Sequence, residues 1–126
     1  MSTNNKHVSE SVFLTPLIIK MKIEETLNIT KNYPTFREFY DESKPLIYKT
    51  LLDGYRKISE DPEKKVDIRV NAIVEGLDFG ANFLIEKENS EIVDRLINLY
   101  LPYYEGVEDY ETCSEIKVIY EKIKGV

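Results

Sequence analysis

Residues 43–58 read SKPLIYKTLLDGYRKI, and this stretch decides the fold that the sequence predicts. Its apolar side chains recur three and four residues apart, which is the spacing of one face of an α-helix. The stripe consists of Ile47, Tyr48, Leu51, Leu52, Tyr55 and Ile58. Ser43 and Pro45 suit a helix start, because a proline in the first turn lacks only an N–H that has no partner there. We therefore expect an amphipathic helix, in which Gly54 costs about 1 kcal/mol relative to alanine.

Two further helical stripes follow toward the C-terminus. Residues 90–104 are apolar over a wide arc, so this helix is expected to be central. Pro102 should end or kink it, because proline has no backbone donor and crowds the preceding turn. Residues 108–124 carry the last stripe, with lysines near the end and Gly125 as a natural stop. The sequence thus predicts a C-terminal helical hairpin over residues 90–124.

The segment over residues 15–27 fits either a helix or a strand. Thr15 and Pro16 suit a helix start, and the apolar residues that follow recur every four positions. The same residues also alternate with charged ones, which is the pattern of a half-buried strand. We favour the helix.

Residues 61–84 pose the same alternative. Asp61 and Pro62 form a helix start, and close helix packing or a break is expected near Gly76. The apolar residues that follow this start at helical spacing are Val66, Val70, Ile73, Val74, Leu77, Ala81 and Leu84. With helices favoured throughout, the fold class predicted is all-α: one domain built as an irregular bundle of about five helices. Residues 1–10 would form a loose N-terminal segment. A minor two-stranded element near residues 17–23 or 66–70 is the alternative.

Composition limits the class of protein. The 126 residues suffice for one domain that needs no disulfide or metal, and the single cysteine, Cys113, cannot form an intrachain disulfide. His7 is the only histidine and lies in the N-terminal segment. The polar N-terminus has no signal-peptide core, and no apolar run is long enough to span a bilayer. We expect a cytoplasmic protein without membrane contact, in the host cytoplasm or a virion if a phage encodes it.

The net charge of −6 is concentrated in the second half of the chain. Residues 1–57 balance to +2, residues 58–85 to −3 and residues 86–126 to −5. Phosphate backbones are bound by Lys and Arg, so direct nucleic-acid binding is not expected. Tyrosines, which are favoured at protein interfaces, accompany the densest acidic patch. The predicted surface for a protein partner, one of basic character, comprises Tyr100, Tyr103, Tyr104, Glu105, Glu108, Asp109, Tyr110 and Glu111.

One acidic pattern points to a different chemistry. Glu88, Glu91 and Asp94 fall three residues apart, and helical nucleotide hydrolases hold Mg²⁺ with such carboxylate stripes. That arrangement needs a second acidic set, for which Glu24 and Glu25 are the available pair. No zinc pattern, phosphate loop or nucleophile elbow is present. No catalytic residue, metal ligand or cofactor is predicted, and the Mg²⁺-dependent hydrolase is kept as an alternative function.

The end of the chain carries a motif-like segment. Residues 109–117 read DYETCSEIK, followed by Tyr120 and Ile123. This segment resembles the UVR motif, the short helical hairpin of excision-repair proteins and of some protease adaptors. Cys113 and Ser114 stand where that motif usually has two alanines, and Val118 replaces its aspartate. The resemblance implies a protein-docking, often self-associating hairpin, and it implies no repair activity.

These observations favour a non-catalytic interaction protein, such as an adaptor, an inhibitor or an accessory protein. Its contact surface would be the acidic, tyrosine-rich hairpin. The small size and the Ile-, Lys-, Asn- and Glu-rich composition suit a phage accessory protein. The alternative is a structural subunit of a larger assembly such as a virion, and a homo-oligomer would fit either function.

Overall fold

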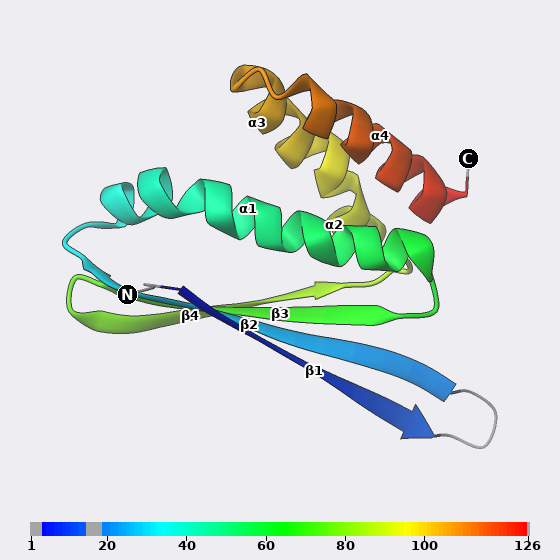
Figure 1. Ribbon diagram of the computed structural model, residues 1–126, viewed down its shortest axis with the longest axis horizontal. Helices are drawn as coiled ribbons and strands as arrows, with labels where there is room; N and C mark the ends of the chain where they lie inside the picture. Colours follow the sequence, from blue (N-terminus) through cyan, green and yellow to red (C-terminus); the bar gives the residue numbers. More distant parts are fainter. Residues whose placement is uncertain (1–3, 15–18, 126) are drawn as a thin grey trace.

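The chain forms a four-stranded mixed sheet with helices stacked on one face (Figure 1). The structure, a computed structural model, describes the backbone of residues 4–14 and 19–125 and the side chains of residues 22–125. The strands are β1 (Asn4–Leu14), β2 (Ile19–Tyr33), β3 (Lys65–Val74) and β4 (Leu77–Ile85). The helical elements are α1 (Phe36–Glu60), α2 (Ser90–Arg95), η1 (Leu96–Tyr100), α3 (Leu101–Gly106) and α4 (Tyr110–Lys124).

The strands lie in the order β1-β2-β3-β4. β1 and β2 pair antiparallel, as do β3 and β4, whereas β2 and β3 pair parallel. A parallel pair needs a long crossover connection, which α1 supplies. The β3–β4 turn places Glu75 at φ 54° and Gly76 at φ 75°. Two consecutive positive φ values are typical of the tight hairpin turn that matches the twist of its strands.

The prediction of an all-α bundle is wrong. Residues 19–27, for which we favoured a helix, belong to β2, and residues 65–85 form β3 and β4 instead of a helix. The predicted start at Thr15 and Pro16 and residues 17–18 lie outside the described residues. The first ten residues were expected to be loose, but the backbone from Asn4 onward forms β1.

The error has a simple geometric cause. Four is close to a full helical turn, but it is also an even number, so residues four apart share one face of a strand as well. The intermediate residues decide between the two. In β3, Ile68 and Ala72 lie between Val66, Val70 and Val74, and all five are buried on the same face. A period of two therefore describes β3 better than a period of four.

Helix α1 packs closely against this apolar face. Leu51, Tyr55 and Ile58 are almost fully buried. Gly54 lies at the closest approach, because a Cβ there would stand 2.9 Å from the Cδ1 atoms of both Ile68 and Ile85. The glycine that weakens the isolated helix thus allows α1 to approach the sheet.

The C-terminal hairpin, made of α2, η1 and α3 in one arm and α4 in the other, lies over α1 on the side away from the sheet (Figure 1). The first arm continues past Pro102 to Gly106, although proline was expected to end or kink it. The residues before this proline form a π-helical turn, in which the Leu101 N–H donates to the Leu96 carbonyl oxygen. The wider turn lets the arm continue despite the missing donor of Pro102.

One carboxylate lies among the apolar side chains. Glu25 of β2 shares the buried face with Ile23 and Leu27, and its side chain has no exposed surface. The Lys57 ammonium of α1 donates a hydrogen bond to Glu25 Oε1. Because a buried charge is costly without a partner, Lys57 compensates the buried Glu25 carboxylate and joins the last turn of α1 to β2.

Candidate functional site

Tyrosines join α1 to the C-terminal hairpin. The ring of Tyr48 on α1 packs edge-to-face against Tyr100 and Tyr103, with both pairs of centroids 4.9 Å apart. The Tyr55 hydroxyl donates a hydrogen bond of 2.7 Å to the Ile92 carbonyl oxygen. Tyr100 is only 2% exposed. Of the predicted partner-binding residues, Tyr100 therefore belongs to the core and is too buried to take part in a protein interface.

Burial also fixes the protonation of these tyrosines. It raises the pKa of Tyr100 above its usual value, and it raises the pKa of Tyr104 to about 12. Both hydroxyls therefore stay protonated near neutral pH. They can donate hydrogen bonds, but they are poorly suited to act as general bases.

A groove of about 550 Å³ separates α1 from the turn between α3 and α4. We call it the corner groove, and its lining includes Leu52, Asp53, Arg56, Tyr104, Val107 and Glu115. The Arg56 guanidinium donates to Asp53 Oδ1 at 2.6 Å and also pairs with Glu115 of α4. This ion-pair network links the two walls of the groove.

Asp109 serves the start of α4. Its carboxylate accepts hydrogen bonds from the Thr112 backbone N–H at 3.1 Å and from the Thr112 hydroxyl at 2.7 Å. These hydrogen bonds lower the pKa of Asp109. This N-cap holds the turn in place, with the preceding Glu108 at φ 59°.

The remaining predicted residues lie beside the corner groove or on the surface next to it. Tyr103 and Tyr104 are half-buried in the groove, whereas Glu105, Glu108 and Glu111 are exposed. Tyr110 is 65% exposed. Val107, which sequence reasoning missed, is 56% exposed and lines the corner groove. We call Glu105, Val107, Glu108, Tyr110 and Glu111 the hairpin tip.

Sequence reasoning also missed the α1 wall of the groove. Lys49, Asp53 and Arg56 lie there at spacings of four and three residues. That spacing was a usable signal, because it places the three charged side chains along one side of a helix. The apolar stripe of residues 43–58 predicts the helix but does not reveal this charged side.

Of the predicted acidic stripe Glu88, Glu91 and Asp94, Asp94 is held in contacts with α4. Asp94 Oδ1 accepts a hydrogen bond from the Tyr120 hydroxyl at 3.1 Å and pairs with the Lys124 ammonium at 3.0 Å. The Lys124 contact lowers the pKa of Asp94. Glu88 and Glu91 are exposed. The second acidic pair is split, because Glu25 is buried beneath α1 and its neighbour in the strand points to the opposite face.

Among the described residues, no cluster of three or more His, Cys, Asp or Glu side chains could hold a metal ion. None of the helices in this part of the chain is long and apolar enough to cross a membrane. No protein-family model matches the chain, and neither a curated protein nor a solved structure matches it.

Proposed function

We propose that the chain is a non-catalytic protein-binding module of the cytoplasm, and that it binds a basic segment of its partner at the hairpin tip and the corner groove. The supporting observation is that exposed apolar side chains lie beside exposed glutamates at the hairpin tip. Val107 and Tyr110 are more than half exposed, and the surrounding glutamates are exposed as well. Aromatic side chains are enriched at interfaces, and a charged rim around them attracts a partner of opposite charge.

The charge of this region supports a basic partner. Residues 96–116 contain five acidic residues and no Lys, Arg or His. Electrostatic complementarity of this kind steers association and makes it sensitive to salt. The adjacent corner groove, about 550 Å³ in volume, could accept an apolar or basic side chain of the partner.

The contacts of the polar groups favour binding over catalysis. Asp109 caps α4, Arg56 bridges two carboxylates, and burial keeps the Tyr104 hydroxyl protonated. These groups shape the surface and already have structural partners. A catalytic acid or base instead needs a pKa near the working pH and access to a substrate.

A peptide-display selection on the folded full-length chain tests the proposal. We expect selected peptides to be rich in Lys and Arg and to contain an aromatic or aliphatic residue. Their binding should shift backbone amide signals of residues 103–112 and should weaken at high salt. The double variant Glu108→Lys/Glu111→Lys should lose at least tenfold in affinity.

The matched control is Glu121→Lys, which reverses an exposed charge farther along α4. It should bind the selected peptides nearly as well as the unaltered chain. Peptides without basic enrichment, or amide shifts confined to the sheet and the first half of α1, would contradict the proposal.

A further inference from the structure

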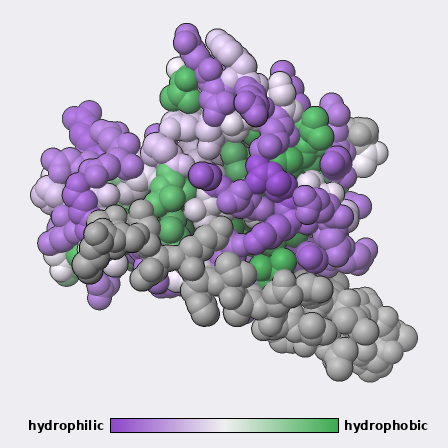
Figure 2. All heavy atoms as spheres, in the orientation of Figure 1, coloured by the Kyte–Doolittle hydropathy of each residue, from purple (hydrophilic) through white to green (hydrophobic). Residues whose placement is uncertain are grey.

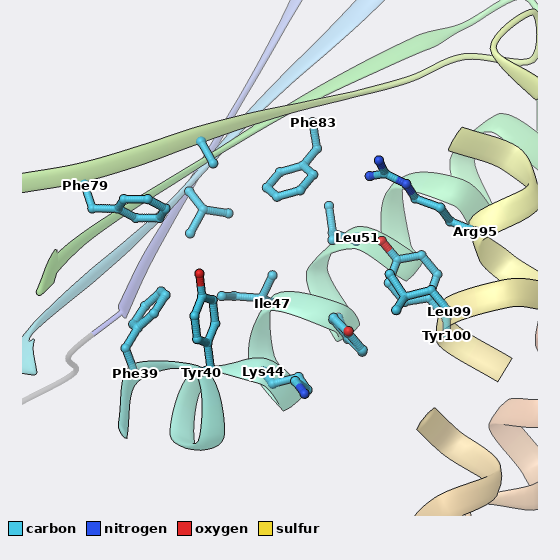
Figure 3. A pocket seen from close by; sticks show the side chains of 13 residues that line it. Phe39, Tyr40, Lys44, Ile47, Leu51, Phe79, Phe83, Arg95, Leu99 and Tyr100 are labelled. Carbon is cyan, nitrogen blue, oxygen red and sulfur yellow. The ribbon is translucent and has the colours of Figure 1, made fainter. Parts of the chain in front are cut away.

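A second hollow lies on the other flank of α1, between this helix, β4 and η1. Its volume is about 250 Å³. We call it the β4 cleft, and its lining includes Ile47 and Leu51 of α1, Phe79 and Phe83 of β4, and Leu99 and Tyr100 of η1 (Figure 3). Figure 2 shows small hydrophobic patches among the hydrophilic surface in the region where α1 lies beneath the C-terminal hairpin.

The charge around the β4 cleft is opposite to that of the whole chain. The net charge is −6, yet the described residues that line the cleft include Lys44 and Arg95 and no acid. Within the described part of the chain, neither cation forms an ion pair. The Arg95 guanidinium points toward Phe83 at the edge of the cleft (Figure 3). A guanidinium without a carboxylate partner beside an apolar hollow favours an anionic group there.

Two hydroxyls add directional polar contacts. In Figure 3 the hydroxyls of Tyr40 and Tyr100 both point into the space between α1, β4 and η1. Burial holds the pKa of Tyr100 above its usual value, so its hydroxyl keeps its proton, and this hydroxyl also forms a hydrogen bond with the side chain of Tyr55. An apolar pocket with a few convergent polar groups is the usual form of a small-molecule site.

The wall contributed by η1 is unusual in its backbone. Its π-helical turn, closed by the Leu101 N–H on the Leu96 carbonyl oxygen, carries Leu99 and Tyr100. Single π-turns within helices occur frequently at functional sites. In this protein, the π-turn therefore forms part of the wall of the β4 cleft.

We propose that the β4 cleft binds a small amphipathic carboxylate, with its carboxylate on Arg95 and its apolar body between Phe79, Phe83 and Leu51. The volume sets the size of the body. At about 250 Å³, the cleft lies just below the usual volume range of ligand pockets, roughly 300–1,000 Å³, so only a small apolar body fits. The ligand class is therefore a medium-chain fatty acid or an aryl acid of similar volume.

Titration of the full-length chain with sodium decanoate, below its micelle concentration, tests this proposal. Calorimetry should show saturable binding of one ligand, and amide signals of residues 79–83 and 95–100 should shift. Arg95→Gln should weaken binding at least tenfold, whereas Lys122→Gln, which removes an exposed charge on α4, should leave it unchanged. Decanol should bind the unaltered chain and the Arg95→Gln variant equally.

A second variant tests whether the ligand occupies the cleft itself, without any change of charge. Ala81 is half-buried in the lining, and the larger side chain of Ala81→Leu would fill part of the cleft without changing charge. With an unchanged circular dichroism spectrum, this variant should lose decanoate binding. Non-saturable binding with scattered amide shifts, or affinity that neither Arg95→Gln nor Ala81→Leu reduces, would overturn the proposal. Binding of an amphipathic peptide in the cleft without any decanoate binding would also overturn it.

Discussion

The hollows on the two flanks of α1 differ in polarity and in charge. On one flank, the β4 cleft is apolar, and its only charged lining residues among those described are Lys44 and Arg95. On the other, the corner groove contains carboxylates and an Arg56 that is already paired. The adjacent residues Leu51 and Leu52 point to opposite flanks, since one lines the cleft and the other the groove.

The difference arises from what packs against the helix. The cleft is built on a β-strand, whose alternate residues Phe79, Ala81 and Phe83 present an apolar face to α1. The groove lies between α1 and the C-terminal hairpin, which are joined there by the ion pair of Arg56 with Glu115. One helix can therefore offer two surfaces that suit ligands of opposite charge.

The largest effect on stability is expected from replacing Leu51 or Leu52 with alanine. Leu51 and Leu52 are 2% and 4% exposed. Each change to alanine should lower the free energy of unfolding by about 2–5 kcal/mol, through lost burial and a residual cavity. Urea unfolding would measure both losses. Leu51→Ala should also shift the ligand preference of the cleft from decanoate toward dodecanoate, because the cleft becomes larger.

Leu52→Ala serves as the control for that shift. It should lose comparable stability and keep the chain-length preference of the unaltered chain. If both variants changed carboxylate binding alike, the two flanks would not be independent, and the comparison would fail.

Sequence analysis predicted the helices better than the sheet. A helical face over residues 43–58 requires spacings of three as well as four, such as Tyr48 to Leu51 and Leu52 to Tyr55, and residues three apart lie on opposite faces of a strand. In β3, Val66, Val70 and Val74 fit both patterns. Val70 and Ile73 even add a spacing of three that favours a helix, although Ile73 lies on the other face of the strand. Strand pairing is also a long-range interaction that no local pattern contains.

The two candidate sites also differ in how far the sequence alone can reveal them. The hairpin tip is contiguous in sequence, and its acids and tyrosines could be identified directly, although Tyr100 proved to be buried. The β4 cleft joins residues from α1, β4 and η1, which only the fold brings together. Nothing in the sequence near Arg95 indicates that its guanidinium lies beside Phe83.

The two flanks should also respond differently to loss of their arginines. Arg56 joins Asp53 and Glu115, so Arg56→Gln should lower the free energy of unfolding by about 0.5–1 kcal/mol at low salt, and by less at high salt. Arg95 has no ion-pair partner among the described residues, so Arg95→Gln should leave stability within about 0.5 kcal/mol of the unaltered chain.

Denaturant unfolding at two salt concentrations measures both arginine effects. A large loss of stability for Arg95→Gln would show that its charge serves the fold rather than a ligand. That result would weaken the contrast between an unpaired and a paired cation.

A smaller effect is expected from pH. The Lys124 contact lowers the pKa of Asp94 in the folded state, so this carboxylate stabilises the hairpin above the unfolded pKa of about 3.9. The contribution is lost as pH falls through the lower folded-state value. Asp94→Asn should therefore be less stable than the unaltered chain at pH 7, and the two should converge toward pH 2. Asp78→Asn, at an exposed position of β4, is the matched control.

Hydrogen exchange then shows where the stability is lost. Asp94 accepts from Tyr120 and pairs with Lys124, both on α4, so acid should expose α4 amides before those of β3. The sheet side of α1 carries the Glu25–Lys57 ion pair, but it also rests on the burial of Leu51 and Ile58, which acid does not alter directly. Simultaneous loss of protection in α4 and β3, in both the unaltered chain and Asp94→Asn, would mean that the two flanks of α1 unfold as one unit. The difference in charge between the two flanks would then influence which ligands bind, without making one flank less stable than the other in acid.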